Sequence, residues 1–555
     1  MTELISFLIG SLILYLSYYI VGVFIFEKIY SKIQIVNYHE TTLLGLFVIS
    51  FIAIFLNFFT PLTPHVNLFF LLSSLCLIFF IKKNNFAKIF YHSLFFIIAL
   101  VVFTIYARNP EDASLYHLSY ISLINVEKIN FGISNFHSRF GHTSIIQYLS
   151  AISFIPFLSK YLIISQNNFF YCLIIAILFS KLRLNLIKKE AYNSCFNFLC
   201  LIYISLKLAK FSDWGNDLLP AILTFYITSF LIDYLTRQKI NKNFFYIYFF
   251  LLSIITFIFF SKISYIVLYS ILIFLIYDLQ DIKKILNYKI IFSFFLIILV
   301  LVVKNLITTS CIIYPIPSTC LETIWSSGEI NDVNKLYLEA KSWSMGISNL
   351  ETKNAVSPEI FIKNFYWVKT WMNIHFIKVI EKIFSFLFYL SLILIIIKFK
   401  FKFKNTLQYI PKFHKYLLFI FFTYVYIWFI SAPLFRYGTG LIITLVIILI
   451  IPVILKYFNF NHDQYKIFYT FALVIVFSTI LVKNIIRINN DKNEQIMPKT
   501  FDNSTLNSVT IDSHKLFYKN GSECFYPKNS PCIKNKPEAI KKILTFGKYK
   551  IYIPY

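Results

Sequence analysis

Charged side chains are scarce in this chain. They make up 14% of its 555 residues, whereas soluble domains carry about 25%, and 58% of the residues are hydrophobic. Long apolar stretches recur from one end of the sequence to the other, each long enough to cross a hydrocarbon core of about 30 Å. The composition therefore excludes an ordinary soluble fold and predicts a multi-pass membrane protein.

The sequence also lacks the signatures of nucleotide-dependent and zinc enzymes. It has only 12 glycines, and it contains no glycine-rich phosphate loop, no dinucleotide-binding fingerprint, no His-Glu-x-x-His motif and no Gly-x-Ser-x-Gly turn. We therefore expect no nucleotide hydrolysis, no cofactor and no dedicated metal site. The first apolar stretch, Leu4–Phe26, has neither a basic leader nor a small-residue cleavage site, so we expect it to stay as a membrane span.

Positive charge is in excess, with 52 Lys and Arg against 26 Asp and Glu. A net charge of +26 would suit a nucleic-acid-binding protein, but the basic residues gather in short loops between apolar stretches, such as Lys181–Lys189 and Lys398–Lys404. That distribution follows the positive-inside rule, and no basic soluble domain or aromatic RNA-binding motif is present. The expected partner is the lipid bilayer and not a nucleic acid.

Hydropathy predicts an all-α, polytopic transmembrane helix bundle with about 13–15 spans. The apolar segments are residues 4–26, 42–59, 65–81, 88–106, 167–181, 193–209, 218–236, 244–261, 264–279, 288–307, 376–397, 415–431, 438–456 and 467–483. With the basic loops in the cytoplasm, the alternation places the N-terminus and the C-terminal tail on the periplasmic side of a bacterial inner membrane. Segment 144–165 breaks the alternation, so we expect it to be a re-entrant or interfacial piece beside a site.

This topology divides the chain into membrane and periplasmic parts. The membrane parts are the N-terminal, central and C-terminal groups of spans, in residues 1–106, 166–307 and 376–483. The periplasmic parts are a first large loop with interfacial helices, a second large loop and a C-terminal tail, in residues 107–165, 308–375 and 484–555. Because function tends to reside in long loops on a rigid scaffold, we expect any chemistry in the periplasmic parts.

The eight cysteines provide a separate indication of sidedness. Four of them form two close pairs, Cys311 with Cys320 and Cys524 with Cys532, and both pairs fall in stretches that the charge rule places outside. Disulfides persist in the oxidising periplasm, whereas a metal site would favour a shorter spacing with further ligands nearby. We therefore predict a disulfide within each pair.

The first periplasmic loop gathers acidic, basic and histidine side chains. They are Glu111, Asp112, His117, His137, Arg139 and His142. An outward carboxylate beside His and Arg could act as a general base on an acceptor hydroxyl. Asp112 also directly precedes a stretch with helical spacing, residues 114–130, where an acid favours the helix N-terminus. Both interpretations of Asp112 stay open.

Three further charged residues lie at the ends of predicted spans. Asp217 could be a second carboxylate of a site or only a helix start before Pro220. Arg436, in the turn Ser431–Gly440, could bind a phosphate in bidentate fashion or anchor the span at the lipid headgroups. Lys262 is a weaker cation candidate at a membrane boundary.

Several short stretches resemble a known type of membrane enzyme. They are Asp112–His117, Asn135–Gly141, Lys304–Pro315, Ala432–Gly440 and Cys524–Cys532. With the many spans and two large outer loops, they resemble a bacterial family of polytopic membrane proteins similar to the C-superfamily glycosyltransferases, which use polyprenyl-phosphate-linked sugars. The chain differs from typical members in that about three extra spans precede the acidic loop.

The resemblance implies a glycosyltransferase-C-like fold and an inverting transfer of sugar from a polyprenyl-phosphate-type lipid donor to a periplasmic acceptor. Asp112, with Glu111 beside it, would be catalytic and would deprotonate the acceptor, while Arg436 would hold the phosphate leaving group. The remaining substrate-binding residues would be His117, His137, Arg139, His142, Asp217 and Lys262.

Two other classes of function stay open. An O-antigen polymerase or ligase would have a site dominated by Arg and His of the 308–375 loop, with Asp112 remote from it. A flippase or transporter would have charges lining a path at mid-depth and an internal repeat. The transferase interpretation instead predicts that Asp112, Asp217 and Arg436 converge on one outward cavity.

Overall fold

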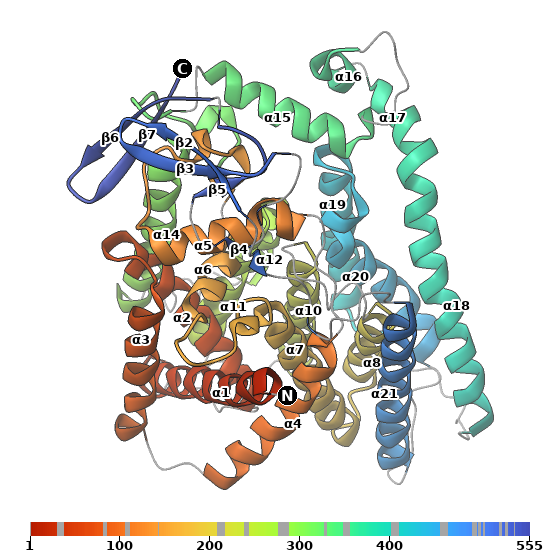
Figure 1. Cartoon of the computed structure of the whole chain (residues 1–555). Helices are drawn as coiled ribbons and strands as arrows, with labels where there is room; N and C mark the ends of the chain where they lie inside the picture. Colours follow the sequence, from red (N-terminus) through yellow and green to blue (C-terminus); the bar gives the residue numbers. More distant parts are fainter. Residues whose placement is uncertain are drawn as a thin grey trace.

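The computed structural model is a helical bundle with a small β-structured tail (Figure 1). It describes residues 2–29, 38–81, 86–105, 112–142, 144–207, 217–237, 244–275, 288–326, 330–347, 356–363, 365–400, 410–455, 464–490, 497, 501–502, 505–520, 524, 526–527, 531–537 and 539–555. Glu111, one of the two predicted catalytic residues, lies outside the described residues.

Up to residue 490, the regular elements of the described residues are helices. The first group is α1 (Thr2–Ile29), α2 (Tyr38–Phe59), α3 (Pro64–Cys76), η1 (Leu77–Phe80) and α4 (Phe86–Thr104). Short helices follow in η2 (Ala113–His117), α5 (Leu118–Val126), η3 (Ile133–Asn135), η4 (Ser138–Gly141), α6 (Ile145–Ile152) and η5 (Lys160–Leu162). The central group is α7 (Gln166–Ile187), α8 (Ala191–Leu206), α10 (Leu219–Arg237), α11 (Phe244–Ser261), η6 (Ile263–Leu268), α12 (Tyr269–Leu275) and α14 (Tyr288–Thr309). The last group is η7 (Pro317–Thr319), α15 (Ile330–Ser344), α16 (Pro358–Lys363), α17 (Tyr366–Trp371), η9 (Met372–Phe376), α18 (Ile377–Lys400), α19 (Phe413–Ser431), α20 (Phe435–Ile454) and α21 (Gln464–Asn490).

The helices confirm the prediction of a multi-pass membrane bundle. Within the described residues, eight helices are long and apolar enough to cross a membrane. They are Thr2–Lys28, Tyr38–Phe59, Gln166–Ile187, Leu219–Thr236, Tyr366–Phe399, Phe413–Ser431, Phe435–Ile454 and Gln464–Asn490. Six further apolar helices are shorter. Every apolar segment predicted from hydropathy overlaps one of these helices. A helix suits such a segment because a backbone in lipid must satisfy its own hydrogen bonds.

Small residues let neighbouring helices approach closely. A Cβ atom built on Gly22 of α1 would lie 1.9 Å from the carbonyl oxygen of Thr41 in α2, and one on Gly45 would lie 1.7 Å from that of Tyr18. Both contacts require glycine, because any side chain would collide with the opposite backbone. Such small-residue contacts are common between helices in lipid. Because lipid is as apolar as the helices, no hydrophobic effect drives the helices together, and close packing stabilises their contact instead.

The segment that broke the predicted alternation does not form a membrane-crossing helix. Within residues 144–165 the structure has α6, with eight residues, and the three-residue turn η5. An eight-residue helix extends about 12 Å, less than half of the hydrocarbon core. All eight residues of α6 are buried, so its backbone is shielded by protein on every side.

The described residues of the tail form seven short strands, which the all-α prediction did not include. They are β1 (Phe501–Asp502), β2 (Asn507–Ile511), β3 (His514–Tyr518), β4 (Tyr526–Pro527), β5 (Cys532–Ile533), β6 (Ile540–Phe546) and β7 (Tyr549–Pro554). β1 pairs with β4 in parallel, β3 lies between antiparallel β2 and parallel β5, and β6 and β7 form a hairpin. The strands escaped prediction because most have two to five residues, too few for a period-two pattern to stand out.

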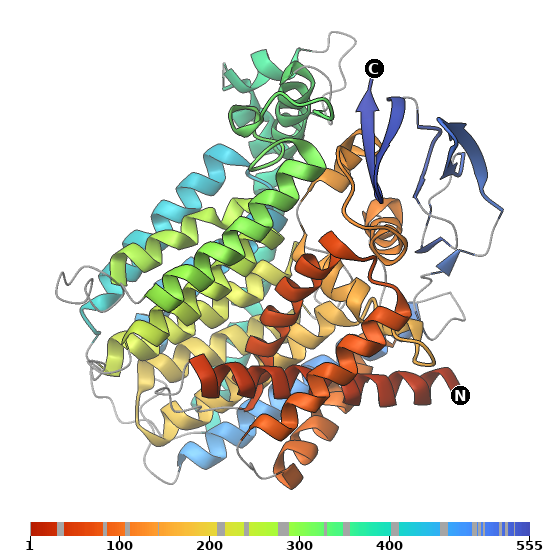
Figure 2. The same cartoon turned by 90° about the vertical axis from the view of Figure 1, so that its left-hand side faces the viewer.

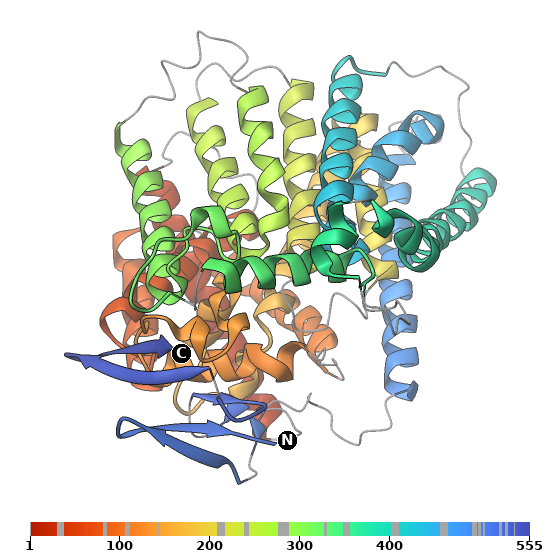
Figure 3. The ribbon, with the colours of Figure 1, turned by 90° about the horizontal axis from the view of Figure 1, so that it is seen from above.

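The tail packs on the first predicted periplasmic loop. The amide of Phe131 donates to the carbonyl oxygen of Lys550 at 2.9 Å, and the amide of Tyr552 donates to that of Phe131 at 3.0 Å. Lys550 also forms an ion pair with Glu127. Figure 2 and Figure 3 show the C-terminal strands against the orange segments of the first loop. The first loop and the tail, which the charge rule assigned to one side, therefore lie together.

Candidate functional site

A cavity of about 580 Å³ lies where the first loop meets the ends of helices from the central and last groups. Seven of the nine residues predicted to be catalytic or substrate-binding line it. They are Asp112, His117, Arg139, His142, Asp217, Lys262 and Arg436. His137 does not line the cavity but stacks on Tyr116, which does, with 6.2 Å between ring centroids. Residues far apart in the sequence are thus brought to one place.

Asp217 is held between two cations. Its Oδ1 atom accepts a hydrogen bond from Lys262 Nζ, and its Oδ2 atom lies 3.3 Å from Arg436 Nε. Burial alone would raise the pKa of Asp217, but the Lys262 ammonium and the Arg436 guanidinium outweigh burial and hold that pKa below its usual value. Asp217 is therefore an ionised anchor for two cations and a poor proton acceptor.

Asp112 is the freer of the two carboxylates. Its side chain is 38% exposed against 25% for Asp217, and its Oδ2 atom lies 3.8 Å from Arg436 Nη1. It makes no capping hydrogen bond to the turn that follows it. That turn, η2, is a single π-helical turn ahead of α5, where the sequence predicted regular helical spacing. Such wider turns occur frequently at functional sites.

Arg436 faces the cavity from the first turn of α20. Its guanidinium carbon lies 5.2 Å from the ring centroids of both Trp343 and Tyr437. α20 approaches α10 closely, because a Cβ atom on Gly440 would lie only 2.7 Å from the Cα atom of Ala221. This contact sets the start of α20 beside Asp217, which precedes α10. Arg436 is thus paired with Asp217, with 3.3 Å between Nε and Oδ2.

The histidines of the cavity are neutral at pH 7. Burial lowers the pKa of His117 to about 3, and burial together with the nearby Arg139 guanidinium lowers the pKa of His142 to about 3. Behind the cavity, burial lowers the pKa of His137 to about 4. Gln147 Nε2 donates to His117 Nδ1 at 2.8 Å. These rings are therefore hydrogen-bonding groups of the wall and not cations.

Sequence reasoning missed several cavity residues. Tyr437 is the most informative, because its ring lies under two cations, with Lys262 Nζ 3.7 Å and the Arg436 guanidinium carbon 5.2 Å from its centroid. Tyr337 and Lys341 line the cavity from α15, on one face of that helix. The position of Tyr437 next to Arg436 was the available signal, but with 39 tyrosines in the chain it carried little weight.

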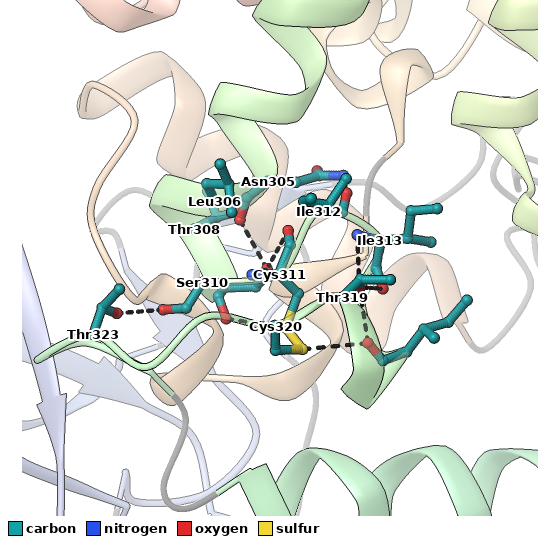
Figure 4. The surroundings of a disulfide bond; sticks show 12 residues. Asn305, Leu306, Thr308, Ser310, Cys311, Ile312, Ile313, Thr319, Cys320 and Thr323 are labelled. Atoms are coloured by element: carbon teal, nitrogen blue, oxygen red, sulfur yellow. Dashed lines mark hydrogen bonds between the residues drawn. A yellow bond between two sulfur atoms is a disulfide. The ribbon is translucent and has the colours of Figure 1, made fainter.

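Both predicted disulfides are present, and one lies beside the cavity. Cys311 is bonded to Cys320, and Cys524 to Cys532. Figure 4 shows the first bond closing a loop in which Thr319 Oγ1 donates to the carbonyl oxygen of Ile313 at 3.0 Å. The middle of this loop holds Pro315 and Ile316, which line the cavity. The disulfide therefore holds part of the cavity wall.

The loop closed by the Cys311–Cys320 disulfide packs against Gly141 and His142 of the first loop. The ring centroid of Tyr314 lies 5.5 Å from that of His142, and a Cβ atom on Gly141 would lie 2.8 Å from the Tyr314 ring. Gly141 therefore cannot carry a side chain without moving Tyr314. Lys304, which belongs to a stretch singled out in the sequence, is fully buried in α14 and does not line the cavity.

A second, apolar hollow of about 310 Å³ adjoins the cavity. Among the described residues that line it, Asn305 is the one strongly polar side chain, and the others come from η6, α11, α12, α14 and the 312–313 segment. Ile263 and Ile266 of η6 line both hollows. A charged cavity and an apolar groove thus share one wall, an arrangement suited to a ligand with an anionic head and a hydrocarbon chain.

The described residues contain no group of three or more His, Cys, Asp or Glu that could hold a metal ion. The side chains that line the cavity can transfer a proton at a carboxylate and can stabilise negative charge by Arg and Lys.

The comparisons with known proteins give one family. A family model described as Domain of unknown function (DUF8201) matches residues 4–443, a range that includes every residue lining the cavity. No curated protein and no solved structure matches the chain. The match does not extend to the β-structured tail.

Proposed function

This chain belongs to the DUF8201 family, and we propose that it is a glycosyltransferase of the bacterial inner membrane. It moves a sugar from a polyprenyl-phosphate-type lipid donor to an acceptor hydroxyl on the periplasmic face, with a fold of the glycosyltransferase-C type. The observation that carries the proposal is the convergence of Asp112 with the Asp217–Arg436–Lys262 cluster on one cavity that adjoins an apolar groove.

The reaction assigns a different role to each carboxylate. The acceptor oxygen attacks the anomeric carbon while its proton passes to Asp112, and the bond from that carbon to the phosphate oxygen breaks. The electron pair stays on the phosphate, where Arg436 stabilises the added charge, and the sugar is transferred with inversion. Asp217 orients Arg436 and Lys262 by its two oxygens. A positioned general base contributes typically about 10²–10⁴-fold to the rate.

The adjoining groove supports a lipid-linked donor. The prenyl chain occupies the apolar groove between η6 and α14, and the phosphate reaches the cavity past the shared residues Ile263 and Ile266. Burial of apolar surface favours such a chain by about 25 cal/mol for each Å² removed from water. The donor would enter sideways from the bilayer.

A periplasmic location of the site is supported by the two disulfide-bearing segments that lie near it. The segment that carries Asp112 packs on the tail with the Cys524–Cys532 disulfide, and the Cys311–Cys320 loop forms part of the cavity wall. Disulfides persist in the periplasm and not in the cytosol. The N-terminus and the tail share that side in this proposal.

The alternatives from the sequence fit the cavity less well. A polymerase or ligase site would be made of Arg and His from the second loop, with Asp112 remote from it. The described lining residues from that loop include neither Arg nor His, and Asp112 lines the same cavity. A transport path would need charges at mid-depth, whereas Asp217 precedes α10, Lys262 follows α11 and Arg436 lies in the first turn of α20.

The test is to replace Asp112→Asn and Arg436→Ala separately in a strain whose surface polysaccharide depends on this gene. We expect the glycan to be lost in both, and the sugar-loaded prenyl phosphate to accumulate in extracted lipids measured by mass spectrometry. Glu339→Gln and Lys335→Ala are matched controls, because both side chains are exposed on α15 outside the cavity lining. Unchanged glycan in both cavity variants, at normal protein levels, would refute the proposal.

A further inference from the structure

The cavity carries more positive than negative charge. Among the described residues that line it, Arg139, Lys262, Lys341 and Arg436 are cations, and Asp112 and Asp217 are carboxylates. The two lining histidines contribute no charge at pH 7, because burial lowers their pKa values to about 3. The described wall therefore holds two more cations than carboxylates.

The cations fall into two pairs. Lys262 and Arg436 are engaged by Asp217, and Arg436 is also close to Asp112. Arg139 and Lys341 have no carboxylate partner within the described part of the chain. Each of these two cations instead lies near a tyrosine ring. The Arg139 guanidinium carbon lies 5.8 Å from the Tyr116 ring centroid, and Lys341 Nζ lies 5.8 Å from that of Tyr337.

A ring beneath a cation holds its position and leaves its N–H groups available. Tyr116 and Tyr337 themselves line the cavity, so both supported cations are held at its wall. They come from η4 and α15, two segments of different outer loops. Arg139 and Lys341, which have no acidic partner among the described residues, come to one cavity from separate segments. Together they form a binding site for an anion in addition to the Asp217 cluster.

We propose that the donor carries a diphosphate and not a monophosphate between lipid and sugar. The sugar-linked phosphate lies at Arg436, beside the base Asp112, and the lipid-linked phosphate lies between Arg139 and Lys341. This inference rests on the proposed function, because it assumes a lipid-linked sugar as the substrate. It goes further by naming the anionic linkage that the cavity accepts.

Charge matching is the physical reason why the cavity prefers a diphosphate to a monophosphate. A sugar joined to a lipid through one phosphate is a diester with a single negative charge, which would leave one of the two excess cations unmatched. A diphosphate diester has two negative charges and matches both. An unmatched charge in a partly desolvated cavity is unfavourable, so the wall selects the doubly charged linkage. In the reaction the carbon–oxygen bond at the sugar breaks and the electron pair remains on the diphosphate, which leaves with the lipid.

The test measures binding of two diesters, farnesyl methyl phosphate with one negative charge and farnesyl methyl diphosphate with two, to the purified full-length protein in lipid nanodiscs, with farnesol as the uncharged reference. We expect the diphosphate to bind about tenfold tighter or more. In Arg139→Gln and Lys341→Ala the ratio falls toward one, mainly through weaker binding of the diphosphate. Lys335→Ala, an exposed lysine on the same helix as Lys341, keeps the wild-type ratio.

The outcomes separate the two proposals. Equal affinities for the two phosphates, or tighter binding of the monophosphate, would overturn the diphosphate inference and leave the transferase proposal standing. A wild-type preference that survives in both cavity variants would also overturn it. If neither phosphate binds better than farnesol, the proposed function itself fails. Thermal unfolding of each variant shows whether it is folded.

Discussion

The Oδ2 atom of Asp217 lies 3.3 Å from the Nε atom of Arg436, so a residue that precedes α10 is paired with one in the first turn of α20. The other oxygen of the same carboxylate accepts from Lys262. This pairing separates the roles of the two aspartates in the cavity. Asp217 organises positive charge, and Asp112 remains available to accept a proton.

Asp112→Asn and Asp217→Asn should therefore fail in different ways. Without its base, the Asp112→Asn protein should lose about 10²–10⁴-fold in kcat with donor binding and thermal stability retained. Asp217→Asn leaves Lys262 and Arg436 without their shared partner, so the melting temperature and donor affinity should both fall. Steady-state kinetics and thermal unfolding distinguish the two. Equal losses of kcat with unchanged melting temperatures would contradict the division of roles.

Arg436→Lys should keep the charge but not the geometry. A lysine cannot present a planar fork to a phosphate and stacks less well on Trp343 and Tyr437. We expect activity to fall by about ten- to a hundredfold, a loss equivalent to about 1.4–2.7 kcal/mol, while the protein melts near the wild-type temperature. Full activity in this variant would show that Arg436 acts only as a point charge.

Tyr437 can be tested by separating its ring from its hydroxyl. Tyr437→Phe keeps the ring beneath Lys262 and Arg436, and should retain most activity. Tyr437→Leu removes the ring and about 0.5–2 kcal/mol of cation–π interaction, so KM for the donor should rise more than kcat falls. If the Phe variant is as impaired as the Leu variant, the hydroxyl and not the ring is the important group.

The two disulfides should differ in their effect on the cavity. Replacing Cys311 and Cys320 by Ser frees the loop that carries Pro315 and Ile316, so KM should rise and the protein should melt earlier. Replacing Cys524 and Cys532 is the matched control, because that bond lies in the tail and its cysteines do not line the cavity. An equal rise in KM in both double variants would show that the first loop has no special role.

Acid should destabilise the folded protein through the cavity histidines. His117 and His142 have pKa values of about 3 in the fold against about 6.5 when unfolded. The unfolded chain therefore binds more protons between these values, and stability present above pH 6.5 is lost as the pH falls toward 3. Melting temperatures from pH 8 to 5 should decline, and less steeply in His142→Asn. His514→Asn, in the tail, should keep the wild-type slope.

Much of the fold was predictable because its signals are local. Each apolar segment contains in its own residues the information that makes it a membrane helix. The cysteines of each pair are fewer than ten residues apart, so each disulfide forms between neighbouring parts of the chain. The helix predicted after Asp112 is present, but its first turn is the π turn η2. The β-structured tail was missed because most of its strands have two to five residues, too few for an alternating pattern to stand out.

The sequence by itself determined that this is a multi-pass helical membrane protein with two disulfides, because hydropathy and short-range spacing act within a few turns of chain. Only the tertiary structure decided that Asp112, Asp217 and Arg436 meet, since their meeting depends on helix contacts such as Gly440 against Ala221. It also decided which charges are available. Burial neutralises the histidines, ion pairing occupies Asp217, and no local pattern encodes either effect.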